Sequence, residues 1–96
     1  MPEINLKIII TQEKDVICKQ TEEGGILLDL KTGNYFIVSK IGFFIWRMLN
    51  KPKALEKIMP KVISRYSVKK TKAFSDIVKF IKILYAKKLI SLASVK

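Results

Sequence analysis

The sequence contains no histidine and a single cysteine, Cys18. Without histidine the chain lacks the usual general base, the usual activator of a nucleophile and the commonest metal ligand. One cysteine can neither complete a zinc site nor form an internal disulfide bond, so we expect a reducing, cytoplasmic location. Only two of the eight acidic residues, Glu56 and Asp76, lie beyond the first 30 residues. The sequence therefore predicts no enzyme, no metal site and no cofactor.

Long apolar runs and targeting signals are also missing. The longest uncharged apolar stretch, residues 41–46, is far shorter than the roughly 20 residues that cross a bilayer. Charged residues at positions 3 and 7 occupy the place where a secretory signal has its apolar region. We therefore expect neither membrane insertion nor secretion. The 96 residues, 49% hydrophobic and 28% charged, predict one globular domain over residues 1–96.

The positive charge is concentrated in the second half of the chain. Residues 1–50 carry six basic and six acidic residues, whereas residues 51–96 carry thirteen basic and two acidic residues, which accounts for the net charge of +11. A field of one sign attracts acidic partners, although lysines on helices also serve simply to solvate them. Only Arg47 and Arg65 are arginines. Sequence-specific contact with nucleic acid relies on arginine, so the composition argues against it.

The first third of the chain has the alternation of strands. Apolar residues occupy every second position from Ile4 to Ile10, which is typical of a half-buried strand. We expect residues 1–12 to form an additional strand or a mobile arm. Residues 16–18 read as a second short strand, in which Cys18 is interpreted as a small buried apolar side chain and not as a reactive thiol.

A hairpin is the clearest local signal. Residues 26–30 and 35–38 are rich in strand formers and flank residues 31–34, where Gly33 and Asn34 both tolerate the positive φ of a tight turn. The second of these runs, taken from residue 34 to residue 38, has no charge that would block pairing with another chain.

Both faces of this last strand are apolar. Phe36 and Val38 share one face, whereas Tyr35 and Ile37 share the other. The pattern predicts either a central strand that is buried on two sides or an edge strand that awaits a partner.

Three helices are expected after the hairpin. The first begins at Ser39, a good N-cap residue, and ends at residues 50–52. The second has an apolar stripe over residues 55–66 that passes through Pro60, which predicts a kinked helix or a helix that begins near this proline. The third is predicted over about residues 71–90.

The third helix has an anomalous polar face. Its expected buried arc consists of Phe74, Ile77, Val78, Ile81, Leu84 and Tyr85. Lys72, Lys79 and Lys82 lie on or near the opposite side, and Ile83 projects among them with Phe80 beside it. Phe80 and Ile83 together are interpreted as an apolar contact patch ringed by lysines. Strands followed by three helices predict an α+β fold of winged-helix-like character, whose sheet is covered on one face and has a free edge.

Several of these segments resemble a known family. Leu-Leu-Asp-Leu-Lys-Thr-Gly-Asn-Tyr-Phe at residues 27–36, Ser39, and Gly-Phe-Phe-Ile-Trp-Arg-Met-Leu at residues 42–49 resemble the PqqD-like leader-binding domains of ribosomally made and modified peptide pathways. Residues 76–84 are similar to the third-helix pattern of that family. The family usually has glycine where this chain has Lys88. The resemblance covers roughly residues 15–91 and is strongest to the stand-alone recognition elements of lasso-peptide pathways.

The resemblance implies a fold and a function. The fold is a three-stranded antiparallel sheet followed by three helices, with a leader peptide held as an added strand between the last strand and the third helix. It implies a non-catalytic adaptor that presents the leader of a precursor peptide to a leader protease or, as in other branches of the family, to a radical-SAM or other modifying enzyme. The expected peptide-binding residues are Asn34, Tyr35, Phe36, Ile37, Val38, Lys72, Asp76, Ile77, Lys79, Phe80, Ile81, Lys82 and Ile83.

Two other classes of function remain open from the residues alone. A winged-helix nucleic-acid-binding protein would insert the third helix into a major groove and use the hairpin as its wing. The exposed face of that helix offers lysines and Ile83 but no Arg, Asn or Gln for base edges, which argues against this alternative. A purely structural subunit would bind neither peptide nor nucleic acid.

Overall fold

The predicted hairpin and the strand before it form a three-stranded antiparallel sheet in the computed structural model, which describes residues 2–94. In spatial order its strands are β2 (Val16–Thr21), β3 (Gly24–Asp29) and β4 (Tyr35–Ser39). Leu28 pairs with Tyr35, and Ile26 pairs with Ile37. The turn between β3 and β4 requires a glycine because Gly33 has a φ of +78°.

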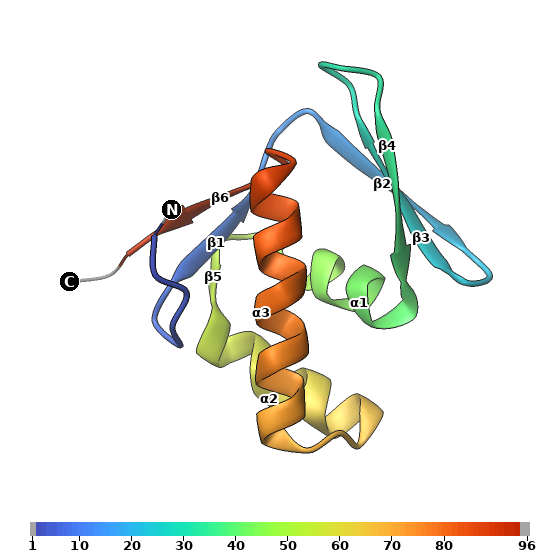
Figure 1. The fold of residues 1–96 in the computed structure, drawn as a ribbon. Helices are drawn as coiled ribbons and strands as arrows, with labels where there is room; N and C mark the ends of the chain where they lie inside the picture. Colours follow the sequence, from blue (N-terminus) through green and yellow to red (C-terminus); the bar gives the residue numbers. More distant parts are fainter. Residues whose placement is uncertain (1, 95–96) are drawn as a thin grey trace.

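A second sheet lies on the other side of the molecule (Figure 1). Its strands, in the order β5-β1-β6, are β5 (Lys53–Ala54), β1 (Ile9–Gln12) and β6 (Ile90–Ala93). The sequence predicts either an additional strand or a mobile arm for residues 1–12, and the structure shows a strand. This strand begins at Ile9 and not near Ile4, because a turn at residues 6–7 breaks the extended chain and leaves Leu6 exposed. It pairs with β5 and β6 and not with the β2–β4 sheet.

The three helices are α1 (Lys40–Met48), α2 (Leu55–Tyr66) and α3 (Lys70–Ala86). Ser39 caps α1 as predicted, since its Oγ accepts a hydrogen bond of 3.1 Å from the backbone N–H of Gly42. Helix α2 runs through Pro60 without interruption, so the alternative of a helix that begins near this proline is wrong.

The predicted end of α3 at residue 90 is wrong. The helix ends at Ala86 because Lys88 adopts the left-handed conformation, with a φ of +61°. The N–H of Leu89 donates to the carbonyl of Leu84, and the N–H of Lys88 donates to that of Tyr85, both at 3.0 Å. These two bonds form a Schellman motif, which reverses the chain and releases Ile90 into β6.

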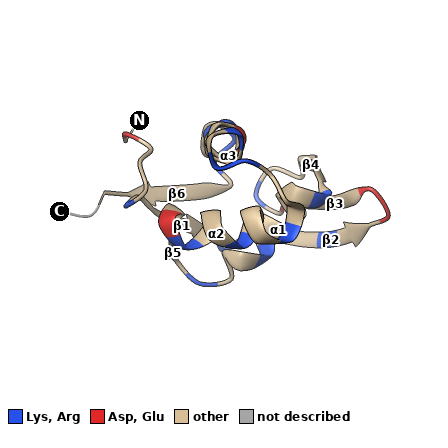
Figure 2. Ribbon diagram, turned by 90° about the horizontal axis from the view of Figure 1, so that it is seen from below, with Lys and Arg blue, Asp and Glu red and all other residues tan. Residues whose placement is uncertain are grey.

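Helix α3 lies between the two sheets on one side of the molecule, and α1 and α2 lie on the other side (Figures 1 and 2). One apolar core connects them, and its buried members are Ile8, Ile10, Leu27, Val38, Ile45, Trp46, Leu49, Leu55, Ile58, Met59, Val62, Ala73, Ile77, Ile81, Leu84, Leu89 and Ile90. Gln12 donates from Nε2 to the carbonyl oxygen of Trp46 at 2.6 Å and so ties β1 to α1. Within residues 2–94, no helix has the length and apolar character needed to span a bilayer.

Candidate functional site

Strand β4 is an edge strand, because β3 pairs with one side of it and no strand of residues 2–94 pairs with the other. The N–H of Asp29 donates to the carbonyl of Asn34 at 2.9 Å, so these residues form a hydrogen-bonded pair of the ladder. Hydrogen-bonded and non-hydrogen-bonded pairs alternate along antiparallel strands. Tyr35 and Ile37 therefore direct their backbone N–H and C=O groups toward the free edge. Such an edge is a template for a further strand.

A groove runs beside this edge. A cavity of about 500 Å³ between β4 and α3 is lined by Tyr35, Phe36, Ile37, Val38, Ser39, Phe80, Ile83, Leu84, Lys87 and Leu89. A smaller hollow of about 210 Å³ is lined by Ser39, Ile41, Gly42, Ile45, Asp76, Ile77 and Phe80. Because Ser39 and Phe80 line both, the two hollows adjoin, and we refer to them together as the β4–α3 groove.

The two apolar faces of β4 have different surroundings. Val38 is only 7% exposed, and Phe36 packs against the core on the same face. Tyr35 and Ile37 are 66% and 74% exposed on the opposite face of the sheet. The interpretation of β4 as a central strand is therefore wrong, and the alternative of an edge strand is confirmed.

Helix α3 contributes Phe80 and Ile83 to the groove. Ile83 is 53% exposed, although it is a large apolar residue, and Phe80 is half-buried. Ile77 and Ile81, which we expected to line peptide pockets, are fully buried. Ile81 lines neither hollow and Ile77 reaches only the smaller one, because both side chains point from α3 into the core.

The predicted polar residues are spread around the groove and do not converge on it. Lys72 and Asp76 form an ion pair of 3.1 Å one turn apart on α3, and only Asp76 lines a hollow. Lys79 and Lys82 are exposed on α3. Asn34 is exposed just before β4, and it lines neither hollow.

Sequence reasoning missed Lys87, whose Nζ lies 4.8 Å from the centroid of the Phe36 ring. Both partners of this cation–π contact line the larger hollow of the groove. A helix predicted to continue to residue 90 gave no reason to place Lys87 beside β4. The one available signal was the resemblance: the family usually has glycine where this chain has Lys88, and a glycine commonly follows the end of a helix.

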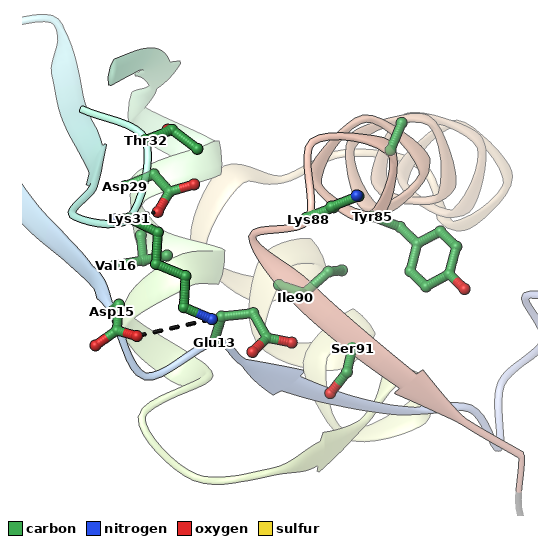
Figure 3. A pocket seen from close by; sticks show the side chains of 11 residues that line it. Glu13, Asp15, Val16, Asp29, Lys31, Thr32, Tyr85, Lys88, Ile90 and Ser91 are labelled. Carbon is green, nitrogen blue, oxygen red and sulfur yellow. Dashed lines mark hydrogen bonds and ion pairs between the residues drawn. The ribbon is translucent and has the colours of Figure 1, made fainter. Parts of the chain in front are cut away.

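Another hollow, of about 640 Å³, lies where the β3–β4 turn approaches the end of α3 and the start of β6 (Figure 3). Its acidic groups make local contacts, since Asp15 lies 3.7 Å from Nζ of Lys31 and Asp29 accepts the backbone N–H of Lys31. Within residues 2–94, no three His, Cys, Asp or Glu residues are grouped so that they could hold a metal ion.

The fold defines the class of domain: an α+β, winged-helix-like domain with an open sheet edge beside an apolar groove. The profile of the family described as "Coenzyme PQQ synthesis protein D (PqqD)" matches residues 24–90. Because this match covers more than half of the chain, the protein belongs to the PqqD family.

Solved structures agree with this assignment. The chain is similar to TbiB1 in complex with the TbiA(beta) leader peptide, with a TM-score of 0.76 and 28% identity, over 84% of this chain and 94% of that chain. It is also similar in fold to lasso peptide synthetase B1 complexed with the leader peptide, with a TM-score of 0.69 and 22% identity, over 85% of this chain and 96% of that one. No curated protein matches.

Proposed function

We propose that this protein is a non-catalytic adaptor that binds the leader of a ribosomally made precursor peptide as an additional strand on β4. The free edge of β4, where Tyr35 and Ile37 present backbone groups beside the β4–α3 groove, is the observation that carries the proposal. The similarity to TbiB1, a protein seen in complex with a leader peptide, supports it.

Strand addition divides affinity and specificity between two kinds of contact. Main-chain hydrogen bonds to the β4 edge supply affinity for any extended peptide, and pockets for alternate side chains select among peptides. Phe36, Val38, Phe80 and Ile83 form the apolar part of these pockets. The other expected peptide-binding residues lie beside these pockets or support them from the core. Lys72, Lys79 and Lys82 speed the capture of an acidic leader more than they tighten its binding.

Chemistry on the bound peptide falls to a partner enzyme. The chain has no histidine, and its one cysteine lies on β2, away from the residues that line the groove. We propose a leader protease as this partner, because the resemblance is strongest to lasso-peptide recognition elements; a radical-SAM or other peptide-modifying enzyme is the alternative partner. Both alternatives place the adaptor in the cytoplasm.

The test is a fluorescence-polarisation titration with the labelled leader of the precursor encoded beside this gene. Ile83→Asp places a charge in the groove and should weaken binding at least roughly tenfold, which is about 1.4 kcal/mol. Ile17→Asp is the matched control, because Ile17 is 52% exposed, close to the 53% of Ile83, and lies on β2 away from the groove. Both variants should keep the melting temperature of the parent protein.

Two results would contradict the proposal: no binding of the leader by the parent protein, or equal affinities for the two aspartate variants. Salt dependence adds a check against charge-driven binding. Binding to a DNA duplex falls steeply as salt rises, whereas leader binding through backbone pairing should fall gently. The nucleic-acid alternative is not favoured by the structure, since both arginines lie outside α3, on α1 and α2.

A further inference from the structure

The protein's two arginines, Arg47 and Arg65, lie close together on a surface formed by α1 and α2. The guanidinium carbon of Arg47 lies 5.8 Å from the centroid of the Phe43 ring, and that of Arg65 lies 5.1 Å from the centroid of Phe44. Tyr66 packs edge-on against Phe44, with ring centroids 5.6 Å apart, and its ring centroid lies 5.9 Å from the guanidinium carbon of Arg65. Each guanidinium group thus makes a cation–π contact with at least one aromatic ring.

Neither arginine forms an ion pair with a carboxylate among residues 2–94, where all three ion pairs use lysine. A guanidinium group stacked on a ring keeps N–H donors directed outward, where they match the two oxygens of a carboxylate or phosphate. The surface therefore presents to a partner two guanidinium groups that form no ion pair within residues 2–94.

Two hollows flank these arginines, one of about 670 Å³ and one of about 380 Å³, and both are lined by Phe44 and Arg65. The cations that line one or both hollows are Lys40, Arg47, Lys53, Lys61 and Arg65. One carboxylate, that of Glu22, lines the smaller hollow. Figure 2 shows blue segments along α1 and α2. We refer to these five cations, with Phe43, Phe44 and Tyr66, as the arginine–aromatic face.

The arginine–aromatic face lies on the side of α1 opposite the β4–α3 groove. Ile41, Gly42 and Ile45 line the groove, whereas Lys40, Phe43, Phe44 and Arg47 line the smaller of the other two hollows. At about 100° per residue the mean directions of these two sets are roughly opposite about the helix axis. A peptide in the groove therefore leaves the arginine–aromatic face open.

The lining of the hollows favours a polypeptide over a nucleic acid. Phe44, Met48 and Pro60 give the larger hollow an apolar lining, which accepts apolar side chains, and a phosphate backbone carries none. Arginine and aromatic residues are also enriched at the centres of protein–protein interfaces, where they contribute most of the binding energy.

We propose that the arginine–aromatic face docks an acidic surface of the enzyme that processes the bound peptide, with carboxylates on Arg47 and Arg65 and apolar side chains in the two hollows. The identity of the partner as a processing enzyme rests on the proposed function; the acidic and apolar chemistry of the partner rests on this surface alone. The adaptor then holds substrate and enzyme on opposite sides of α1.

The test uses a labelled synthetic peptide of about 12 residues that alternates glutamate with leucine, and each titration is repeated on an Ile37→Pro background, whose impaired β4 edge separates strand addition from binding at the arginine–aromatic face. Arg47→Gln/Arg65→Gln should weaken its binding by roughly tenfold or more, in the range of interface hot spots. Lys14→Gln/Lys19→Gln removes the same charge from exposed positions and should weaken binding by less than about twofold, because neither lysine lines the hollows that the peptide would occupy. Arg47→Lys/Arg65→Lys keeps the charge but loses the planar group, and should also weaken binding.

An equal loss of peptide affinity in Arg47→Gln/Arg65→Gln and in Lys14→Gln/Lys19→Gln would overturn the proposal, because it would show that net charge alone attracts the peptide. Tighter binding of a single-stranded DNA of similar length, with the same loss in the arginine variants, would assign the face to nucleic acid and overturn it too. The leader titration is repeated on the arginine and lysine variants without Ile37→Pro and should be unchanged. If the leader binds neither the parent protein nor any variant, while the acidic peptide binds the arginine variant more weakly than the lysine variant, the result refutes the adaptor function and supports the docking face.

Discussion

Gly42 of α1 and Phe80 of α3 are in close contact beside the β4–α3 groove, and a Cβ atom added at Gly42 would lie 3.1 Å from Cζ of the Phe80 ring. The same Cβ atom would lie 3.2 Å from Cβ of Val38 on β4. Both distances are shorter than ordinary contacts between carbon atoms, which are about 3.5–4.0 Å. The absence of a side chain at Gly42 therefore lets the Phe80 ring occupy the place where the two hollows meet.

Gly42→Ala should change the groove more than the stability of the fold. Alanine gains up to about 1 kcal/mol of helix propensity over glycine, which offsets part of the strain against Phe80 and Val38. The Phe80 ring must move by a few tenths of an ångström, so leader affinity should fall while the melting temperature changes little. The double variant Gly42→Ala/Phe80→Leu removes the crowded ring edge and so separates the effect of crowding from the effect of helix propensity. Undiminished leader affinity in Gly42→Ala would show that the ring position does not matter for binding.

Lys88→Gly should stabilise the protein. Lys88 occupies the C′ position of the Schellman motif with a φ of +61°, a conformation that costs an ordinary L-residue roughly 1–2 kcal/mol. Glycine avoids this cost but loses some conformational entropy, so we expect a net gain of about 0.5–1 kcal/mol in the free energy of unfolding. Urea denaturation measures the change. Lys82→Gly, the same substitution at an exposed position inside α3, should instead destabilise by about 1 kcal/mol. A loss of stability in Lys88→Gly would refute the assignment of strain to this residue.

The position of β4 in the sheet illustrates what periodicity can and cannot predict. The alternation at residues 35–38 correctly divides the strand into two faces. It could not decide which face is covered, because all four side chains are apolar and a buried central strand would look the same. That distinction depends on how α1 and Phe80 of α3 pack against the sheet, which the alternation within β4 does not encode.

The second sheet shows the same limit more strongly. Strand β1 pairs with residues 53–54 and 90–93, far away in sequence, and β5 has only two residues. An isolated pair of residues carries no detectable strand pattern. The predicted third helix ends at residue 90 and so takes in the first residue of β6 (Ile90–Ala93), and no strand is predicted for the other three. Ser39 as the N-cap of α1 and the exposed Ile83 were predictable, because local geometry and an apolar residue on a polar face are visible in the sequence itself.

The thiol of Cys18 should react slowly at mildly alkaline pH. Partial burial raises its pKa, and the positive charge of Arg47 opposes that rise. Because the thiolate is the nucleophile, a raised pKa means a smaller reactive fraction at a given pH. Alkylation by iodoacetamide at about pH 8 should therefore be slower than that of a free thiol, whose pKa is about 8.5, and should accelerate as the pH rises. Arg47→Gln should slow it further, and unfolding in urea should remove the difference. Alkylation of the folded protein as fast as that of the unfolded chain would contradict this expectation.

Proline substitution tests the direction of the backbone groups of β4. Ile37 directs its N–H toward the free edge, so Ile37→Pro removes a donor from that edge while the ladder with β3 is kept, as edge strands permit. Leader affinity should fall by roughly tenfold or more, the loss expected for a missing hydrogen bond in a buried pairing, with little change in the urea midpoint. Ile37→Ala controls for the side chain, which is 74% exposed and should be dispensable to the fold. Phe36→Pro is the opposite case, because Phe36 bonds to β3, and it should unfold the sheet. If Ile37→Pro unfolds the protein and Phe36→Pro does not, the ladder is shifted by one residue and the edge offers the groups of Phe36 and Val38 instead.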